Sequence, residues 1–190
     1  MIRRTIFLTL GAVVLVPLAG CDQSKDKAAA TATEPGAATL TAAIGRAPGM
    51  STVAAAIKST GLATVFDGIA PYTVLVPQDD AFGALGETAG RLKAPENGAA
   101  MAAVIKAHVL PGYMTVADIR AALTKAKGKP VRVTTMAGGE VSFTRSGDTL
   151  TVTAADGSVA KVSGSELTAG NGVAIPVDAV LKKLPGASPR

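Results

Sequence analysis

The chain has 190 residues, of which 48% are hydrophobic and 17% charged, a composition that excludes intrinsic disorder and fits one folded domain with additional segments. The formal net charge is +5, which becomes 17 minus 14, or +3, once the two arginines of the first 20 residues are set aside. This mild balance gives no indication of nucleic-acid binding, and a single cysteine excludes an intramolecular disulfide.

The N-terminus has the pattern of an export signal. Arg3 and Arg4 precede an apolar segment, residues 6–18, that is too short to span a bilayer comfortably. The segment ends in Leu-Ala-Gly-Cys, which resembles the bacterial lipobox, where the cysteine is acylated and becomes the first residue of the mature protein. We therefore expect residues 1–20 to be a lipoprotein signal peptide and Cys21 to carry acyl chains, palmitate among them, that hold the protein on a membrane.

Residues 21–38 are predicted to be the lipidated cysteine and a flexible tether. The segment after Cys21 is small and polar and has no apolar period. A flexible chain of about 17 residues has a root-mean-square reach of roughly 20–25 Å. Asp22 resembles the inner-membrane retention signal of enteric-type lipoproteins, which favours the inner membrane facing the periplasm. The outer membrane and the cell surface remain alternatives.

Residues 39–66 have a helical pattern. Apolar residues four apart predict a first helix, and Ser51 or Thr52 can cap a second helix that ends before Gly61. A third short helical piece is expected around Phe66. The domain is therefore predicted to open with helices.

The stretch Y-T-V-L-V-P-Q-D-D-A-F-G-A-L, residues 72–85, predicts a buried strand and a helix. Its apolar run closes at Pro77, which cannot donate to a continuing ladder. Asp79 and Asp80 are N-cap candidates for the helix that follows. Phe82 is expected to be buried against the sheet, and a loop rich in glycine and proline comes next.

A further helix is predicted after Asn97, which can cap it. Its apolar positions and His108 follow the i, i+3, i+4, i+7 spacing of one helical face, so His108 is expected to be buried. It is the sole histidine, and no thiol, second histidine or Ser-His-acid spacing accompanies it. His108 is therefore predicted to be a hydrogen-bonded core residue that braces the turn at Pro111 and Gly112, with no catalytic or metal-ligating role.

A short helix over residues 117–123 precedes a change of period. Alternating apolar residues between 131 and 162, separated by Gly138-Gly139, Ser146-Gly147-Asp148 and Asp156-Gly157, predict a meander of four short strands. The turn aspartates lack the ligand spacing of an EF-hand, so no calcium site is expected.

A basic cluster, Lys125, Lys127, Lys129 and Arg132, lies between that helix and the meander. A solvated loop explains such a cluster in the ordinary case, whereas a functional patch would suit an anionic lipid headgroup or a polysaccharide. Export argues against nucleic acid, and no nucleic-acid partner is predicted.

The closing stretch N-G-V-A-I-P-V-D-A-V-L, residues 171–181, predicts a last strand with alternating, half-buried residues. Asn171 and Gly172 precede it and Asp178 follows it. Pro176 removes a ladder donor, which predicts an edge position or a bulge.

Three of these stretches resemble signatures of the fasciclin domain family. They are T-V-L-V-P-Q-D-D-A-F, A-H-V-L-P-G-Y and N-G-V-A-I-P-V-D-A-V-L, in the family's order, with helices leading and a meander between. The resemblance implies an α+β fold, a fasciclin-like β-sandwich or wedge with helices packed along one side, over residues 39–184, with 185–190 as a C-terminal tail. It assigns the structural motif to the following residues: Pro77, Asp79, Asp80, Phe82, Pro111, Gly112, Asn171, Gly172 and Asp178.

The same resemblance implies a protein without catalytic residues or cofactors. We expect a membrane-anchored extracytoplasmic interaction module, in cell adhesion, biofilm or envelope association, with an unidentified protein or polysaccharide as partner. In the family's middle motif a tyrosine commonly precedes the histidine. Ala107 stands there in this chain, which argues against integrin-type binding.

A small-ligand carrier or sensor in the cell envelope is the alternative. A pocket lined by His108, Tyr113 and the basic cluster would favour a carrier, whereas a closed core with an exposed apolar patch would favour adhesion.

Overall fold

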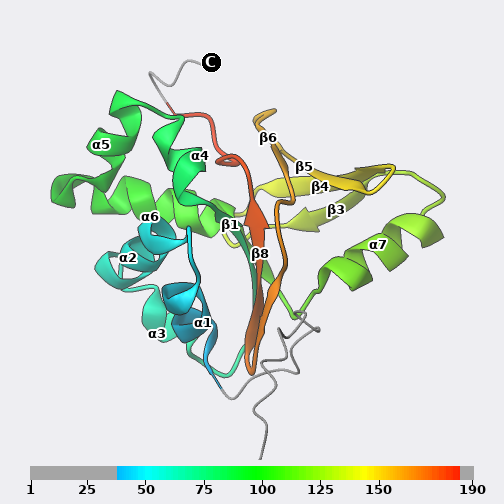
Figure 1. Cartoon of the computed structure of the whole chain (residues 1–190), viewed down its shortest axis with the longest axis horizontal. Helices are drawn as coiled ribbons and strands as arrows, with labels where there is room; N and C mark the ends of the chain where they lie inside the picture. The colour runs from blue at the N-terminus through cyan, green and yellow to red at the C-terminus, as the bar shows by residue number, and fades with distance from the viewer. Residues whose placement is uncertain (1–37, 185–190) are drawn as a thin grey trace, which may run out of the picture. The chain divides into compact units, whose positions relative to one another are not determined.

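The computed structural model describes residues 38–184 (Figure 1). The predicted signal peptide, Cys21, the tether up to residue 37 and the C-terminal tail lie outside the described residues. Within 38–184, every helix is too short or too polar to cross a bilayer.

Two four-stranded sheets form the frame of the domain. The first has the order β2 (Val109–Pro111), β1 (Tyr72–Pro77), β8 (Gly172–Val177) and β7 (Leu167–Ala169), with β1 and β8 parallel and the outer pairs antiparallel. The second is an antiparallel meander of β3 (Val131–Thr134), β4 (Glu140–Ser146), β5 (Thr149–Ala154) and β6 (Val159–Lys161). The predicted meander is therefore confirmed.

The helices largely follow the predicted pattern. They are α1 (Leu40–Arg46), α2 (Ser51–Ser59), α3 (Ala63–Phe66), α4 (Asp79–Gly83), α5 (Glu87–Lys93), the 3₁₀ turn η1 (Pro95–Asn97), α6 (Gly98–Ala107) and α7 (Val116–Lys125). The prediction of a loop after Leu85 is wrong, because α5 and η1 occupy it. Gly90 and the nearby Pro95 weaken the local helical signal, and the burial of Ala89 and Leu92 stabilises the helix instead.

The first sheet is covered on both faces. Val74, Val76 and Ala174 share one apolar core with α1, α2, α4, α5 and α6, whereas Leu75 and Ile175 share a second core with the meander and α7. Figure 1 shows α1, α2, α3 and α6 on one side of β1 and β8, and the meander with α7 on the other. The predicted helical side is thus α1 to α6, while α7 belongs to the second core.

The last strand, β8, differs from its prediction in two ways. All six of its residues are buried, because it lies between two layers, so the prediction of a half-buried strand is wrong. It is also central, not an edge strand. Its pairing with β7 ends at Ala174, and beyond that point the carbonyl of Pro176 accepts from the Ser163 N–H at 2.9 Å. Pro176 has no N–H to donate, but on that side of β8 the pairing with β7 has already ended. The parallel ladder to β1, on the other side, therefore continues to Val177.

Candidate functional site

The first signature joins two distant helix ends. Asp79 accepts hydrogen bonds from the Ser51 N–H at 3.2 Å, the Ser51 hydroxyl at 2.9 Å and the Thr52 N–H at 2.8 Å. Burial acts to raise the pKa of the Asp79 carboxyl, but these bonds from Thr52 and Ser51 outweigh it and hold the pKa below its usual value. Asp79 thus caps α2 across 28 positions of sequence.

Several predicted caps are accordingly wrong. The helix that Asp79 and Asp80 were expected to cap begins at Asp79 itself, and its N-cap residue Gln78 makes no side-chain cap bond. Ser51 and Thr52 receive their cap from Asp79 instead of supplying one. Asn97 makes no cap bond with α6 and donates to the Arg91 carbonyl at 2.7 Å, which also accepts from the Ala94 N–H at the end of α5. The predicted burial of Phe82 is confirmed.

The closing signature fastens the helices to the sheet. The Asn171 side chain accepts from the Leu40 N–H at 2.8 Å and donates to the Phe66 carbonyl at 2.7 Å. A Cβ on the neighbouring Gly172 would overlap the Tyr72 carbonyl oxygen and lie 2.8 Å from the Cδ2 atom of Leu40. Asn171 and Gly172 are therefore required by backbone contacts between α1, α3 and β1.

Two aspartates make hydrogen bonds at the end of the domain where β8 ends, opposite to Asn171. Asp178 accepts from the Lys161 N–H at 2.6 Å, which joins the end of β8 to β6. Asp156 accepts from the Lys183 N–H at 2.7 Å. Partial burial raises the pKa of Asp156, but hydrogen bonds from Ser158 and Lys183 keep that pKa below its usual value. The predicted turn residue Asp156 and the motif residue Asp178 thus both accept from backbone N–H groups, whereas the other turn aspartate, Asp148, lies 3.9 Å from Arg145.

His108 is buried, as predicted, and ties α6 to the C-terminal segment. Its Nδ1 lies 2.8 Å from the Val104 carbonyl oxygen, and its Nε2 accepts from the Leu181 N–H at 2.8 Å. Since a carbonyl only accepts, Nδ1 carries the proton and the ring is neutral. Burial lowers the pKa of His108 to about 4, although the Val104 carbonyl and Asp156 act to raise it. The ring bonds to Val104 and Leu181, so the prediction that it braces the Pro111-Gly112 turn is wrong.

That turn is held by Thr73. The Thr73 hydroxyl donates to the Gly112 carbonyl at 2.9 Å and accepts from the Met114 N–H at 2.8 Å. Gly112 has a φ of 99°, a left-handed value that favours glycine. The turn presents Tyr113 with 40% of its surface exposed. His108 and Tyr113 are therefore not brought into one pocket.

An exposed apolar surface, which the sequence did not predict, lies at the same end of the domain as Tyr113. We call it the Ile69 surface; its residues, all classed as exposed, are Ile69, Ala70, Pro71, Pro111 and Tyr113. Ile69 is fully exposed, and the Pro71 carbonyl accepts from the Gly112 N–H at 2.9 Å, which joins the two loops. The sequence signal for this surface is the apolar run Ile-Ala-Pro directly after Gly68. In the structure none of these three residues belongs to either apolar core.

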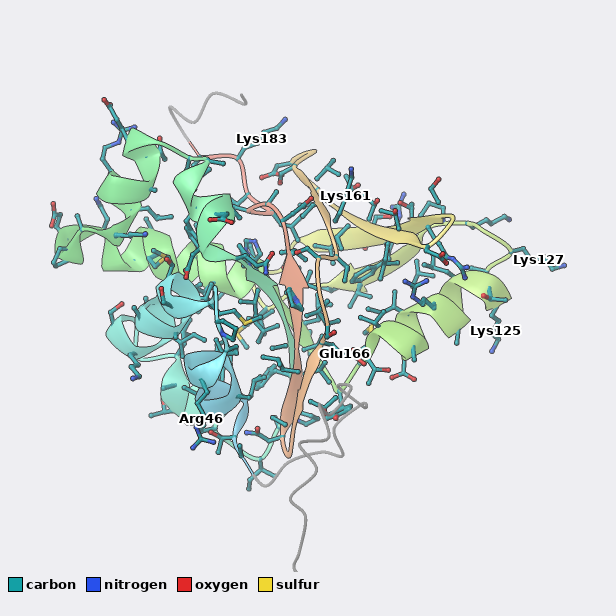
Figure 2. The ribbon with its side chains drawn as sticks, in the orientation of Figure 1. Arg46, Lys125, Lys127, Lys161, Glu166 and Lys183 are labelled. Carbon is teal, nitrogen blue, oxygen red and sulfur yellow. The ribbon has the colours of Figure 1, made fainter. Side chains whose placement is uncertain are left out.

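The basic cluster extends from the C-terminal end of α7 through the following segment to the start of β3 (Figure 2). Lys125, Lys127, Lys129 and Arg132 are all exposed, and Arg132 lies 3.7 Å from Glu140. Lys127 has a φ of 53°, and among the described residues it is the one non-glycine with a left-handed backbone. Such a conformation costs roughly 1 kcal/mol where glycine would be free of strain.

The hollows of the domain involve other residues. One of about 490 Å³ lies between α2 and the α5–α6 segment and is lined largely by small residues such as Ala55 and Gly98. Another of about 360 Å³ lies between the end of α1 and β7, with Arg46 and Glu166 at it. Among the residues that the structure describes, no group of three or more His, Cys, Asp or Glu side chains is placed to hold a metal ion.

Comparisons with known proteins agree on one family. The fasciclin domain model matches residues 48–183. Protein sll1483 of Synechocystis sp. is 32% identical over 136 residues, which cover 69% of this chain and 66% of that protein. The FAS1 domain pair of the insect cell adhesion molecule fasciclin I shares the fold with a TM-score of 0.67 at 14% identity, over 79% of this chain and 52% of that one.

Proposed function

The chain belongs to the fasciclin domain family, and from this membership we propose that it is a membrane-anchored, extracytoplasmic interaction module. The family's domains are in general adhesion modules without enzymatic activity. The proposed role is cell adhesion, biofilm or envelope association, with a protein or polysaccharide as partner. The observation that carries it is the match of residues 48–183 to the fasciclin domain model. The motif residues Asn171 and Asp79 fit this interpretation, because their side chains accept hydrogen bonds from backbone N–H groups of the domain.

The anchor is proposed from the N-terminal sequence. Arg3 and Arg4, the apolar segment and Leu-Ala-Gly-Cys are the features of a lipoprotein signal, and Cys21 is the only thiol of the chain. Two or three acyl chains hold a protein far more firmly than one. Asp22 supports an inner-membrane location facing the periplasm.

The basic cluster is the surface we propose for the partner. It is carried on the outer end of α7, and the strained backbone of Lys127 places a charge where glycine would be more stable. Figure 2 shows the Lys125 and Lys127 side chains extending from this end of the domain. A positive projection of this kind attracts an anionic polymer at long range. An acidic polysaccharide of the envelope is therefore the partner class that the charge supports.

A small-ligand carrier is less well supported. The pocket expected for it would combine His108, Tyr113 and the basic cluster, yet His108 is buried with both ring nitrogens bonded and Tyr113 lies on the Ile69 surface. An exposed apolar surface beside closed cores is the arrangement that favours an interaction module.

Binding to alginate beads tests the partner surface. Changing Lys125, Lys127 and Lys129 together to glutamate should remove salt-sensitive binding, because it reverses the projecting charge. The matched control makes the same charge change at three dispersed, exposed lysines, Lys58, Lys106 and Lys161, and should retain most of the binding. Equal losses in the two variants would show that only net charge matters and would contradict the proposed surface.

A further inference from the structure

The Ile69 surface lies where the chain enters the domain. The carbonyl of Ala38, the first described residue, accepts from the Gly170 N–H at 3.1 Å. The adjacent Asn171 donates to the Phe66 carbonyl, and its own carbonyl accepts from the Tyr72 N–H at 3.4 Å. In Figure 1 the start of the coloured ribbon, the β7–β8 turn and the start of β1 lie together at the lower end of the domain. A continuous set of contacts therefore links Ala38 to the loop that carries Ile69.

The five residues of the Ile69 surface are uncharged, and the Glu166 carboxylate near Tyr113 is occupied by the Val116 N–H at 2.6 Å. Between residues 68 and 72, and again between 109 and 114, the sequence contains no charged residue, and Asp67 is the nearest acid along the chain. Ile69 exposes its whole side chain, while Tyr113 offers an aromatic ring with a polar tip, the combination that is enriched at membrane–water interfaces. An apolar patch without basic residues matches the interfacial region of a bilayer better than it matches anionic headgroups.

We propose that the Ile69 surface docks into the interfacial region of the bilayer that carries the Cys21 acyl chains. This inference rests on the anchor proposed above. The segment from Asp22 to Ala38 has 17 residues, for which flexible-chain scaling gives a root-mean-square distance of roughly 20–25 Å between the lipid and Ala38. Tethering at that range gives the surface a high effective concentration at the membrane, so a few apolar side chains suffice to hold the contact. The end of the domain that bears Ala38 then faces the bilayer, and the basic cluster stays on a different part of the domain.

A single tryptophan tests the docking, because the chain has none of its own. Ile69→Trp places the reporter on the Ile69 surface. Val159→Trp is the matched control, since Val159 is half-exposed on β6, near Lys161 and Asp178 at the opposite end of β8. Both lipidated proteins are reconstituted into zwitterionic phosphatidylcholine vesicles, with and without phosphatidylcholine brominated on its acyl chains. Ile69 is fully exposed and Val159 half-exposed, and neither belongs to an apolar core, so neither variant should change the urea melt by more than about 0.5 kcal/mol.

We expect Ile69→Trp emission to be blue-shifted and to lose intensity with brominated lipid, at low and high salt alike, while Val159→Trp emission changes little. Equal, unquenched emission from both variants in a protein whose acyl groups are seen by mass spectrometry would overturn the docking and leave the anchor intact. A blue shift that grows with protein concentration and resists brominated lipid would assign the surface to a second copy of the chain. A mature chain without acyl groups would overturn the anchor and, with it, this inference.

Discussion

The stability of the domain should fall in mildly acidic solution because of His108, the only histidine of the chain. Its pKa is lowered from 6.5 to about 4, since burial disfavours the charged ring. The unfolded chain therefore binds a proton near pH 6.5 that the folded domain refuses until about pH 4. The stabilisation is complete above the unfolded pKa and is lost as the pH falls toward the folded one.

The linkage relation gives the magnitude. With these two pKa values, the free energy of unfolding should decrease by about 2–3 kcal/mol between roughly pH 7.5 and pH 4.5. The carboxyl groups of Asp79, Asp118 and Asp156 have pKa values below their usual 3.8, so most of their stabilisation is lost only at lower pH. The window between pH 4.5 and 6.5 therefore reports mainly on His108.

Urea melts followed by circular dichroism across this pH range make the measurement, with His108→Gln as the paired variant. The variant should be less stable at pH 7.5 by about 1–3 kcal/mol, because the Val104 carbonyl and the Leu181 N–H lose well-placed partners. It should also lose the pH dependence between 4.5 and 6.5. The account of a neutral ring with both nitrogens hydrogen-bonded would be refuted by either of two results. One is a wild-type free energy of unfolding that does not change over this pH range, and the other is a variant with the same pH dependence as the wild type.

Three further changes test the signatures by urea melts at neutral pH. Asp79→Ala should cost about 1–2 kcal/mol as the lost cap of α2, whereas Asp80→Ala should stay within about 0.5 kcal/mol; equal effects would contradict the cross-chain cap. Gly172→Ala should cost at least about 1–3 kcal/mol because its Cβ meets the Tyr72 carbonyl, and tolerance would contradict the packing of β8 against β1. Phe82→Ala should cost about 3–5 kcal/mol, and a near-neutral result would contradict its burial.

The parts of the fold that the sequence predicted are those set by short-range patterns. Alternating valines and the turn pairs define the meander, and the i, i+7 position of His108 on an apolar helical face predicts its burial. These signals depend on neighbouring residues, so they survive without knowledge of the tertiary contacts.

The parts that could not be predicted depend on contacts between distant segments. Asp79 has the local features of a cap for its own helix, and only the folded chain brings it to Ser51, 28 residues earlier. Pro176 indicates an edge strand until the early end of β7 is known. The Ile69 surface is apolar in sequence, and its exposure follows from the position of its loop outside both cores.

The central claim is that an interaction domain of the fasciclin family is held on a membrane through Cys21. The most direct test is mass spectrometry of the N-terminal peptide together with membrane fractionation of the wild type and Cys21→Ala. The account predicts a mature chain that begins at an acylated Cys21 and stays with the membranes at high salt, and a Cys21→Ala chain that carries no acyl groups and is released. An N-terminal peptide without acyl groups, or a Cys21→Ala chain that still sediments with membranes at high salt, would contradict it.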